Sequence, residues 1–228
     1  MLNGEGLRTV LWVAGCSHHC PQCHNPVTWD INGGLVFDEQ AKEELFEELK
    51  KDYVSGVTFS GGEPTLQAKA LIPLFQRLKE QNIHICIDTN GSIWNEEVEE
   101  LLKWTDLVLL DIKEFNNVRH RQLTERSNEQ TIRTAEWLEK NGKPFWLRYV
   151  LVPGYSSFEE DIRALGEHFK NYHMIQRVEI LPYHTLGVHK YEAMEQEYKL
   201  KDVKENTPEQ LEKATEVFKK YFTTVVVN

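Results

Sequence analysis

No apolar run in this chain is long enough to cross a membrane. A bilayer span needs about 18 consecutive apolar residues, and no stretch of the 228-residue sequence comes near that length. The N-terminus also lacks the apolar core of a secretory signal peptide. We therefore expect a cytoplasmic protein with no membrane partner, in a compartment where thiols stay reduced.

Basic residues are scarce relative to acidic ones. The sequence has 26 Lys and Arg against 36 Asp and Glu, which gives a formal net charge of −10. Binding to nucleic acid or to an anionic membrane needs clustered positive charge, so we expect neither as the main partner. Low-complexity tracts, flexible linkers and repeats are also absent. We expect a single domain over residues 1–228, long enough for a complete hydrophobic core.

Cysteine is rare, yet three of the four cysteines fall within eight residues. Cys16, Cys20 and Cys23 follow the apolar run 9–14 with the spacing C-x3-C-x2-C. A strand leading into a tight loop would let three thiolates converge. Three sulfurs bind three irons of a [4Fe–4S] cluster and leave one iron free of protein ligands, and an open position is where a metal centre does chemistry. Cys86 lies far along the chain in another strand pattern, so we do not count it as a ligand.

Two other interpretations of these cysteines stay open. A structural zinc site could combine the three thiolates with His18, His19 or His24. A disulfide framework is less favoured, because a chain of this size needs no covalent staples and three clustered thiols pair badly.

Strand and helix patterns alternate along the chain. Strands are expected at residues 8–14, 56–60, 83–88, 106–112, 145–152 and 177–181, with a short last strand at 223–227. Helices are expected at residues 39–52 (capped by Asp38), 65–81, 95–103, 128–141, 158–172 and 207–221, with a loop over 182–206. Strict alternation predicts an α/β fold with a parallel sheet and outer helices.

The sheet could be doubly wound or a partial barrel, and the polar motifs favour the barrel. Unusual polar clusters stand at or near the C-terminal ends of the strands: the cysteine loop, 60–63, 88–90, 111–113, Arg148 and 182–184. Barrel active sites are built there, whereas a doubly wound sheet concentrates them at one switch point. Six units are fewer than the eight of a closed barrel, so we expect an open side that admits part of another protein.

The Gly-Gly-Glu sequence that ends the second strand is a candidate ligand site. Gly61 and Gly62 let the backbone approach a ligand closely, and Glu63 with nearby carbonyl groups can receive an ammonium group. Alternatively, residues 61–65 form an ordinary turn from strand to helix. His184 follows a strand end, but the position of a lone histidine favours a structural or surface role.

Charged residues at the third, fourth and fifth strands are further candidates. Asp111 and Lys113 are two residues apart and should share one face of the fourth strand. Asp88 and Asp111 would bind a cation or ribose hydroxyls, or would cap the next helices. Lys113 and Arg148 would donate to a carboxylate, or would form ion pairs with Asp111 or Glu179.

The cysteine spacing together with Gly61-Gly62-Glu63 resembles the radical S-adenosylmethionine (SAM) enzymes. Within them the chain resembles the glycyl-radical enzyme activases, most closely those of pyruvate formate-lyase. The similarity covers nearly the whole chain and is carried by residues 23–25, 28–30, 60–63, 88–91, 110–113, 148–154 and 181–200.

The resemblance implies a partial (β/α)6 barrel of the radical SAM type with three groups of site residues. The cluster and the catalysis would depend on Cys16, Cys20 and Cys23. Contacts to SAM would come from His24, Gly61, Gly62, Glu63, Asp88, Lys113, Arg148 and His184. A Na+ or K+ ion beside the SAM carboxylate would bind Asp88, Thr89, Asp111 and the carbonyl of Leu109.

The resemblance also implies the reaction. One electron cleaves SAM at the cluster, and the resulting 5′-deoxyadenosyl radical removes a hydrogen from a backbone glycine of pyruvate formate-lyase. A flavodoxin or ferredoxin would supply the electron to an activase that we expect to be a monomer. The alternatives are an activase of anaerobic ribonucleotide reductase or of another glycyl-radical enzyme and, from a different class, a non-catalytic zinc or iron–sulfur binding protein.

Three features depart from the family pattern. Gln22 stands immediately before the third cysteine, where the family usually has an aromatic residue near the adenine. The chain begins almost at its first strand, and Gly4-Glu5-Gly6 replaces the usual Gly-Pro-Gly. The short start and residues 16–29 also resemble the ribonucleotide reductase activases, which lack the pattern over 184–200. The absence of further cysteines argues against the dehydratase activases, which carry a ferredoxin-like insertion.

Overall fold

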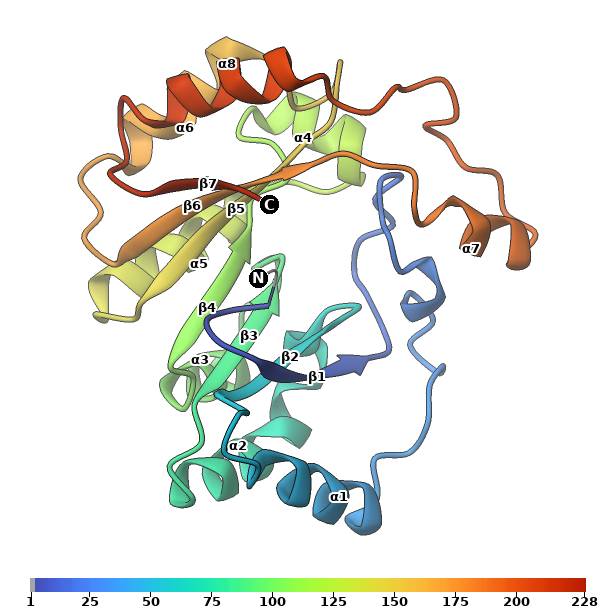
Figure 1. Cartoon of the computed structure of the whole chain (residues 1–228), viewed down its shortest axis with the longest axis vertical. Helices are drawn as coiled ribbons and strands as arrows, with labels where there is room; N and C mark the ends of the chain where they lie inside the picture. The colour runs from blue at the N-terminus through green and yellow to red at the C-terminus, as the bar shows by residue number, and fades with distance from the viewer. Residues whose placement is uncertain (1–2) are drawn as a thin grey trace.

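One parallel sheet of seven strands runs through residues 3–228, the part of the chain that the computed structural model describes (Figure 1). The strands pair in chain order, so each lies beside the strand that precedes it in the sequence. They are β1 (Arg8–Val13), β2 (Gly56–Gly61), β3 (Ile85–Thr89), β4 (Leu107–Asp111), β5 (Phe145–Leu151), β6 (Ile175–Pro182) and β7 (Val225–Val227). All the expected strands, including the short last one, are confirmed.

Helices connect the strands and lie on the outside of the sheet (Figure 1). They are α1 (Glu39–Leu49), α2 (Ala68–Glu80), α3 (Glu96–Lys103), α4 (Asn117–Thr124), α5 (Glu129–Lys140), α6 (Glu159–Phe169), α7 (Val188–Ala193) and α8 (Pro208–Phe218), with 3-10 turns η1 (Pro26–Thr28) and η2 (Pro64–Gln67). Asp38 caps α1 as expected, because its carboxylate accepts a hydrogen bond from the Ala41 N–H at 2.9 Å.

The strand order identifies the sheet as a partial barrel. All neighbouring strands are parallel, and the order β1 to β7 contains no reversal. A doubly wound sheet reverses its order at a switch point, so that alternative is excluded. β1 and β7 are the two edges of the sheet, and Figure 1 shows the sheet curving between them. The expected α/β partial barrel with outer helices is confirmed.

The sequence pattern does not predict two short helices. In α4 only three of eight residues are buried, so the sequence shows no apolar stripe that would indicate this helix. Its start is fixed by Asn116, whose side chain accepts a hydrogen bond from the Val118 N–H at 3.0 Å. α7 has six residues, fewer than two helical turns, inside the segment 182–206. The expectation of an uninterrupted loop over that segment is wrong.

Apolar side chains from the sheet and the helices form a core on the outer face of the barrel. Phe59 of β2 and Phe75 of α2 contact each other there, with ring centroids 4.6 Å apart. Phe218 of α8 packs edge-on against Tyr149 of β5 at 5.6 Å. Among the described residues, no helix is both long and apolar enough to span a bilayer.

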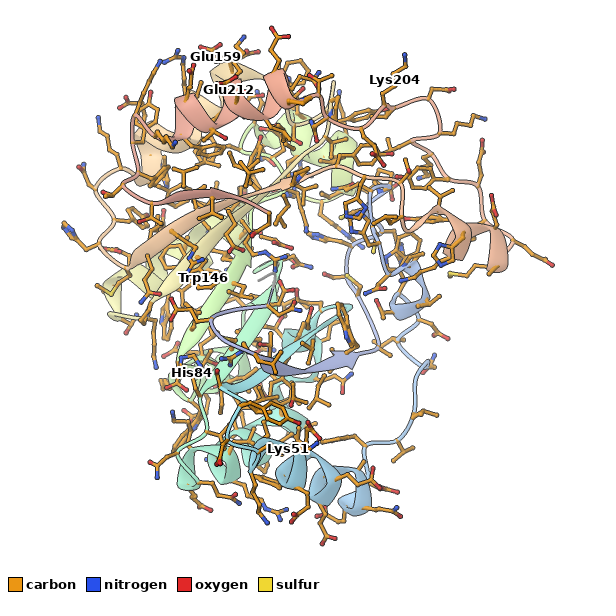
Figure 2. All side chains as sticks on the ribbon, viewed as in Figure 1. Lys51, His84, Trp146, Glu159, Lys204 and Glu212 are labelled. Carbon is orange, nitrogen blue, oxygen red and sulfur yellow. The ribbon has the colours of Figure 1, made fainter. Side chains whose placement is uncertain are left out.

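Side chains fill the inside of the barrel at the N-terminal end of the strands. A small buried cluster occupies it, made of Cys86, Leu107, Leu109 and Trp146. Arg8 lies beside this cluster and donates to the Thr58 hydroxyl at 2.8 Å and to the Val57 carbonyl at 2.6 Å. Figure 2 shows Trp146 and His84 at this end, away from the cysteine loop. The C-terminal ends of the strands therefore remain for a functional site.

Candidate active site

The cysteine loop follows β1, and its two ends are held together by backbone hydrogen bonds. Gly15 has a φ of +93°, and its N–H donates to the Thr28 carbonyl at 2.8 Å. The Cys23 N–H donates to the Cys20 carbonyl at 2.9 Å, which tightens the turn between these two thiols. Cys16, Cys20 and Cys23 all carry free thiols and line one cavity of about 530 Å³. The loop therefore gathers the three expected cluster ligands at one site.

The surroundings of the thiols suit metal-bound sulfur. The His18 N–H points at the Cys16 sulfur and the Asn25 N–H at the Cys23 sulfur, each at 3.4 Å. Burial raises the pKa of Cys16 to about 11 and that of Cys20 to about 12. These thiols thus stay protonated at neutral pH until a metal displaces the protons.

The histidines of the loop are engaged with other rings rather than with the thiols. The contacts are His18 with His120 at 6.1 Å, His19 with Trp29 at 4.9 Å and His24 with His184 at 3.8 Å. Within residues 3–228, no three His, Cys, Asp or Glu side chains already surround a single-ion position. Cysteines that bind different irons of a cluster do not share one ion, and three free thiols that line one cavity suit such a cluster.

Gly61 and Gly62 join β2 to the base of the cysteine loop. Gly61 has a φ of +119°, which disfavours any side chain there. A Cβ on Gly62 would collide with the Gly15 carbonyl, and the Gly62 N–H donates to the Val13 carbonyl at 2.8 Å. Both glycines line the cavity. Their backbone is thus close to the three thiols and open to a ligand.

Glu63 is placed differently from what the sequence suggested. It is fully buried and does not line the cavity. Its carboxylate accepts hydrogen bonds from the Thr65 N–H at 3.0 Å, the Thr89 hydroxyl at 2.7 Å and the Asn90 N–H at 2.8 Å. The side chain therefore ties the end of β2 to the end of β3. The contact of Glu63 with an ammonium group stays a prediction.

Arg148 of β5 lies at the centre of a buried group of charges. Its Nη1 is 2.7 Å from Asp88 Oδ1, and its Nε is 3.5 Å from Asp111 Oδ1 and 3.8 Å from Glu179 Oε2. Lys113 Nζ is 2.5 Å from Asp111 Oδ2. The ion pairs given above as alternative roles for Lys113 and Arg148 are present. All of these residues except Glu179 also line the cavity, so a ligand in the cavity can contact them.

Opposite charges keep this group ionised despite its burial. Burial acts to lower the pKa of Lys113 and Arg148, but Asp111 and Asp88 respectively raise it above the ordinary value. Burial acts to raise the pKa of Asp111, which Lys113 and Arg148 hold below its ordinary value. The cavity thus offers fixed cations and carboxylates together, which complement a zwitterion such as the amino-acid end of SAM.

The proposed cation ligands are only partly gathered. Asp88, Thr89 and Asp111 line the cavity at the ends of β3 and β4. Asp111 Oδ1 is buried and has no hydrogen-bond partner within residues 3–228. Leu109 lies inside β4, opposite Asp88 of β3, and is not part of the cavity lining. The role of its carbonyl stays a prediction.

Two histidines form one wall of the cavity. His24 from the cysteine loop stacks on His184, which follows β6, and both rings line the cavity. Burial lowers the pKa of His24 to about 4, so this ring is neutral at physiological pH. His184 Nδ1 is buried without a hydrogen-bond partner in the described part of the chain. It is therefore available to a ligand, which fits the role expected of His184.

Sequence reasoning missed the residues of α7 that hold the cysteine loop. Lys190 Nζ donates to the His24 carbonyl at 2.8 Å, and the Tyr191 hydroxyl donates to the Cys23 carbonyl at 3.1 Å. Trp12 also went unnoticed; it is 55% exposed and lines the cavity from β1. In the sequence, the functional importance of α7 was indicated only by its position within residues 181–200, one of the stretches that resemble the activases.

The fold and the site together define a radical SAM enzyme. Three free cysteines in a C-x3-C-x2-C loop meet a Gly-Gly turn and buried charges at the C-terminal end of a partial barrel. A family profile described as a 4Fe-4S single cluster domain matches residues 2–133. The structure of Streptococcus suis SuiB bound to SAM shares the fold, with a TM-score of 0.76 at 17% identity over 98% of this chain and 50% of that one.

Curated relatives narrow this class to one family. The pyruvate formate-lyase-activating enzyme of Streptococcus mutans is 40% identical over 96% of this chain and 89% of its own length. The pyruvate formate-lyase 1-activating enzyme of Escherichia coli is 38% identical over 96% of this chain and 92% of its own length. The chain belongs to the family of pyruvate formate-lyase activating enzymes. Its cofactors are accordingly a [4Fe–4S] cluster and SAM, and the donor set of the cavity fits both.

Proposed function

We propose that this chain activates pyruvate formate-lyase by removing a hydrogen atom from a backbone glycine of that enzyme. One observation carries the proposal: a single cavity brings the three loop thiols together with the buried charges at the strand ends. Held by Cys16, Cys20 and Cys23, the cluster would supply the electron for the reductive cleavage of SAM, which is the chemistry that makes removal of the hydrogen atom possible.

The residues of the cavity divide the binding of these cofactors. Cys16, Cys20 and Cys23 would hold the cluster through three of its irons and would leave one iron open for SAM. Lys113 and Arg148 contact the carboxylate end of SAM or the incoming glycine segment. These roles are supported by the lining positions of all five side chains.

The remaining expected contacts belong to the same proposal. The backbone of Gly61 and Gly62 would lie near the SAM ammonium group. His184 would contact the polar groups of SAM, and the backbone at His24 would contact the adenine. A Na+ or K+ ion binds beside the SAM carboxylate, with ligands from Asp88, Thr89, Asp111 and the Leu109 carbonyl.

The open side of the barrel gives the glycine segment a way in. β1 and β7 are the sheet edges, and Asn3 and Asn228 both line the cavity. Residues beside both edge strands therefore border the cavity. We propose that the enzyme works as a cytoplasmic monomer that receives its electron from a flavodoxin or ferredoxin.

Cysteine replacement tests the cluster assignment. Alanine at Cys16, Cys20 or Cys23 should abolish SAM cleavage and reduce bound iron and sulfide after anaerobic reconstitution. Cys86→Ala is the matched control, because Cys86 is fully buried in the apolar cluster at the other end of the barrel. The control should keep about four irons and four sulfides per chain. Loss of the cluster in the control, or one zinc without sulfide in the wild type, would contradict the assignment.

Electron paramagnetic resonance tests the substrate. The reduced holoenzyme with SAM is offered pyruvate formate-lyase and anaerobic ribonucleotide reductase in separate tubes. A glycyl-radical doublet with the lyase alone is expected. A doublet with the reductase alone would replace the proposed substrate with the alternative. Release of 5′-deoxyadenosine without either doublet would retain the radical chemistry and reject both partners.

A further inference from the structure

We propose that a surface groove behind the cysteine loop is the docking site for an acidic one-electron carrier protein. The groove has a volume of about 450 Å³ and is lined by Ser17 and His18 of the loop, and by Ser92, Arg126, Ser127 and Arg133, among others. The inference rests on the proposed function, because only a redox-active cluster needs such a partner.

The groove lies directly against the segment that carries the cluster ligands. Ser17 and His18 follow Cys16 in the chain, and the His18 ring lines both the groove and the cavity. Arg126 Nε donates to the Ser17 carbonyl at 3.2 Å, and the hydroxyls of Ser17 and Ser92 are 3.1 Å apart. Figure 1 shows the tip of the cysteine loop near α4, the helix that ends just before Arg126. A carrier seated here is close to the cluster without entering the cavity.

The cavity itself is not a route for the carrier. During the reaction it must hold SAM and the substrate glycine, which would fill the space that Asp111 and Arg148 line. The electron therefore has to arrive from another side of the cysteine loop. The groove is a recess that borders this loop and shares a wall residue, His18, with the cavity.

The positive charge of two exposed arginines in the groove favours an acidic partner. The chain carries a net charge of −10, yet Arg126 and Arg133 are both exposed and form no ion pair with any other described residue. Glu129 is the one acidic side chain of the lining, and nearby Glu125 is neutralised by Lys199 at 3.1 Å. Two unpaired guanidinium groups on an acidic surface attract a negatively charged protein and orient it during encounter.

The electron balance of the proposed step is simple. The reduced carrier loses one electron and the oxidised cluster gains it, with no proton or bond exchanged. Complementary rim charges act mainly on the rate of association, and screening by salt weakens them. The arginines should therefore affect reduction by a protein carrier and leave reduction by a small reagent unchanged.

The test compares two reductants on one reconstituted protein. The double variant R126E/R133E is reduced either by a photoreduced acidic flavodoxin or by dithionite, and the absorbance of the cluster is followed. At low ionic strength the flavodoxin rate should fall at least about tenfold, in line with electrostatic steering, and the dithionite rate should not change. Salt should slow the wild-type reaction more than that of the variant.

K219E/K220E is the matched control, because it makes the same change in net charge. Lys219 and Lys220 are exposed at the end of α8, which Figure 1 places away from the cysteine loop. This variant should keep the wild-type flavodoxin rate. An equal loss in the control would mean that overall charge is responsible, and would overturn the proposal.

Further outcomes separate the inference from the proposed function. If flavodoxin reduces the cluster of R126E/R133E as fast as that of the wild type, the docking site is overturned. Binding of inorganic phosphate to the groove would not rescue it. If the double charge reversal prevents cluster assembly, R126Q/R133Q takes its place and should show a smaller loss with flavodoxin alone. A wild-type protein that cleaves no SAM with dithionite would reject the radical function itself, whatever the variants do.

Discussion

Gln22 illustrates how a single buried side chain prepares the cavity for its ligand. It is 5% exposed, lines the cavity, and both of its amide atoms lack a hydrogen-bond partner within residues 3–228. An unpaired buried polar group costs about 1–3 kcal/mol. The amide offers a donor beside an acceptor, which is the pattern that Gln uses to bind an adenine edge. SAM carries such an edge, so the amide can recover its lost hydrogen bonds when SAM binds.

Gln22→Leu should weaken the binding of SAM without harming the fold. Loss of one or two net hydrogen bonds of about 1 kcal/mol each raises the dissociation constant on the order of tenfold. Equilibrium dialysis of SAM against the reconstituted protein measures this change. The thermal midpoint without SAM should stay the same or rise, because an unpaired polar group has been removed. An unchanged dissociation constant would show that the amide does not face SAM.

Glu114 is a buried acid whose charge opposes folding at neutral pH. Burial raises the pKa of its carboxyl to about 7. The carboxyl group accepts hydrogen bonds from the Asn116 N–H at 2.9 Å and from the Tyr149 hydroxyl at 3.0 Å. The folded protein therefore binds a proton on Glu114 more tightly than the unfolded chain does. The stability linked to this proton is complete below the ordinary pKa of 4.5 and is lost as the pH rises through about 7.

Glu114→Gln should remove this pH dependence. The amide oxygen can accept from the N–H groups of Phe115 and Asn116, as the Glu114 carboxyl group does, and the amide nitrogen can donate to the Tyr149 oxygen. The variant should gain stability over the wild type between pH 5 and pH 8, up to about 3 kcal/mol at about 1.4 kcal/mol per pKa unit. Thermal midpoints of both reconstituted proteins across this range provide the measurement. A constant difference between the two curves would contradict the pKa shift.

Individual site residues could be predicted where the residues that they act with lie close to them in the sequence. The spacing of Cys16, Cys20 and Cys23 is a local signal, and the structure places all three in one cavity. The carboxylate of Glu63 contacts Thr89 and Asn90, which are 26 and 27 residues away. Nothing in the local sequence states that pairing, so its positioning role became visible only in the folded chain.

At the scale of elements, α7 acts as a clamp on the cysteine loop. Lys190 Nζ contacts the His24 carbonyl and Asn25 Oδ1, and Tyr191 stacks edge-on against Trp29. Gly187 at its N-terminus allows a close approach, because a Cβ there would lie 2.9 Å from the His24 Cα. Six residues are too few for a stable isolated helix. The helix and the loop therefore stabilise each other.

Lys190→Met should loosen the loop and speed the loss of iron. It removes both hydrogen bonds of the Lys190 ammonium group, each worth about 1.5–3 kcal/mol, while keeping most of the side-chain volume. Release of iron to an excess of chelator should become about tenfold faster. Lys201→Met is the control, since among the residues that the structure describes Lys201 pairs only with the exposed Glu197, at 3.0 Å. Equal release rates in the two variants would show that α7 does not restrain the loop.

Elements with a clear apolar pattern were predictable, and those held by polar contacts were not. The central strands could be predicted from the sequence as apolar runs, because both of their faces are covered. β3, for example, has four of its five residues buried. α4 and α7 lack such a pattern and form because Asn116 caps one and the cysteine loop holds the other. Tertiary contacts of this kind leave little trace in the periodicity of a sequence.

For the whole molecule, strict alternation of strands and helices was enough to predict the topology. Right-handed connections between adjacent parallel strands allow few arrangements, and polar clusters at most strand ends selected the barrel over the doubly wound sheet. The shape of the cavity could not be predicted, because it depends on how far the sheet curves and on side chains from six strands. The cavity nevertheless joins the two halves of the barrel, from the cysteine loop to the segment after β6.

Binding of SAM should therefore protect both halves of the barrel at once. A ligand that binds only the native state adds about 2.7 kcal/mol at a hundredfold excess over its dissociation constant, which slows exchange through ligand-releasing openings about a hundredfold. Hydrogen exchange of the holoprotein, with and without SAM, should show this slowing at 15–25, 60–63, 88–91 and 181–190 together. The outer helix α1 serves as the internal control and should be unaffected. Protection confined to 15–25 would mean that the cysteine loop holds SAM alone, and that the charged residues at the ends of β3 to β5 play no part in binding it.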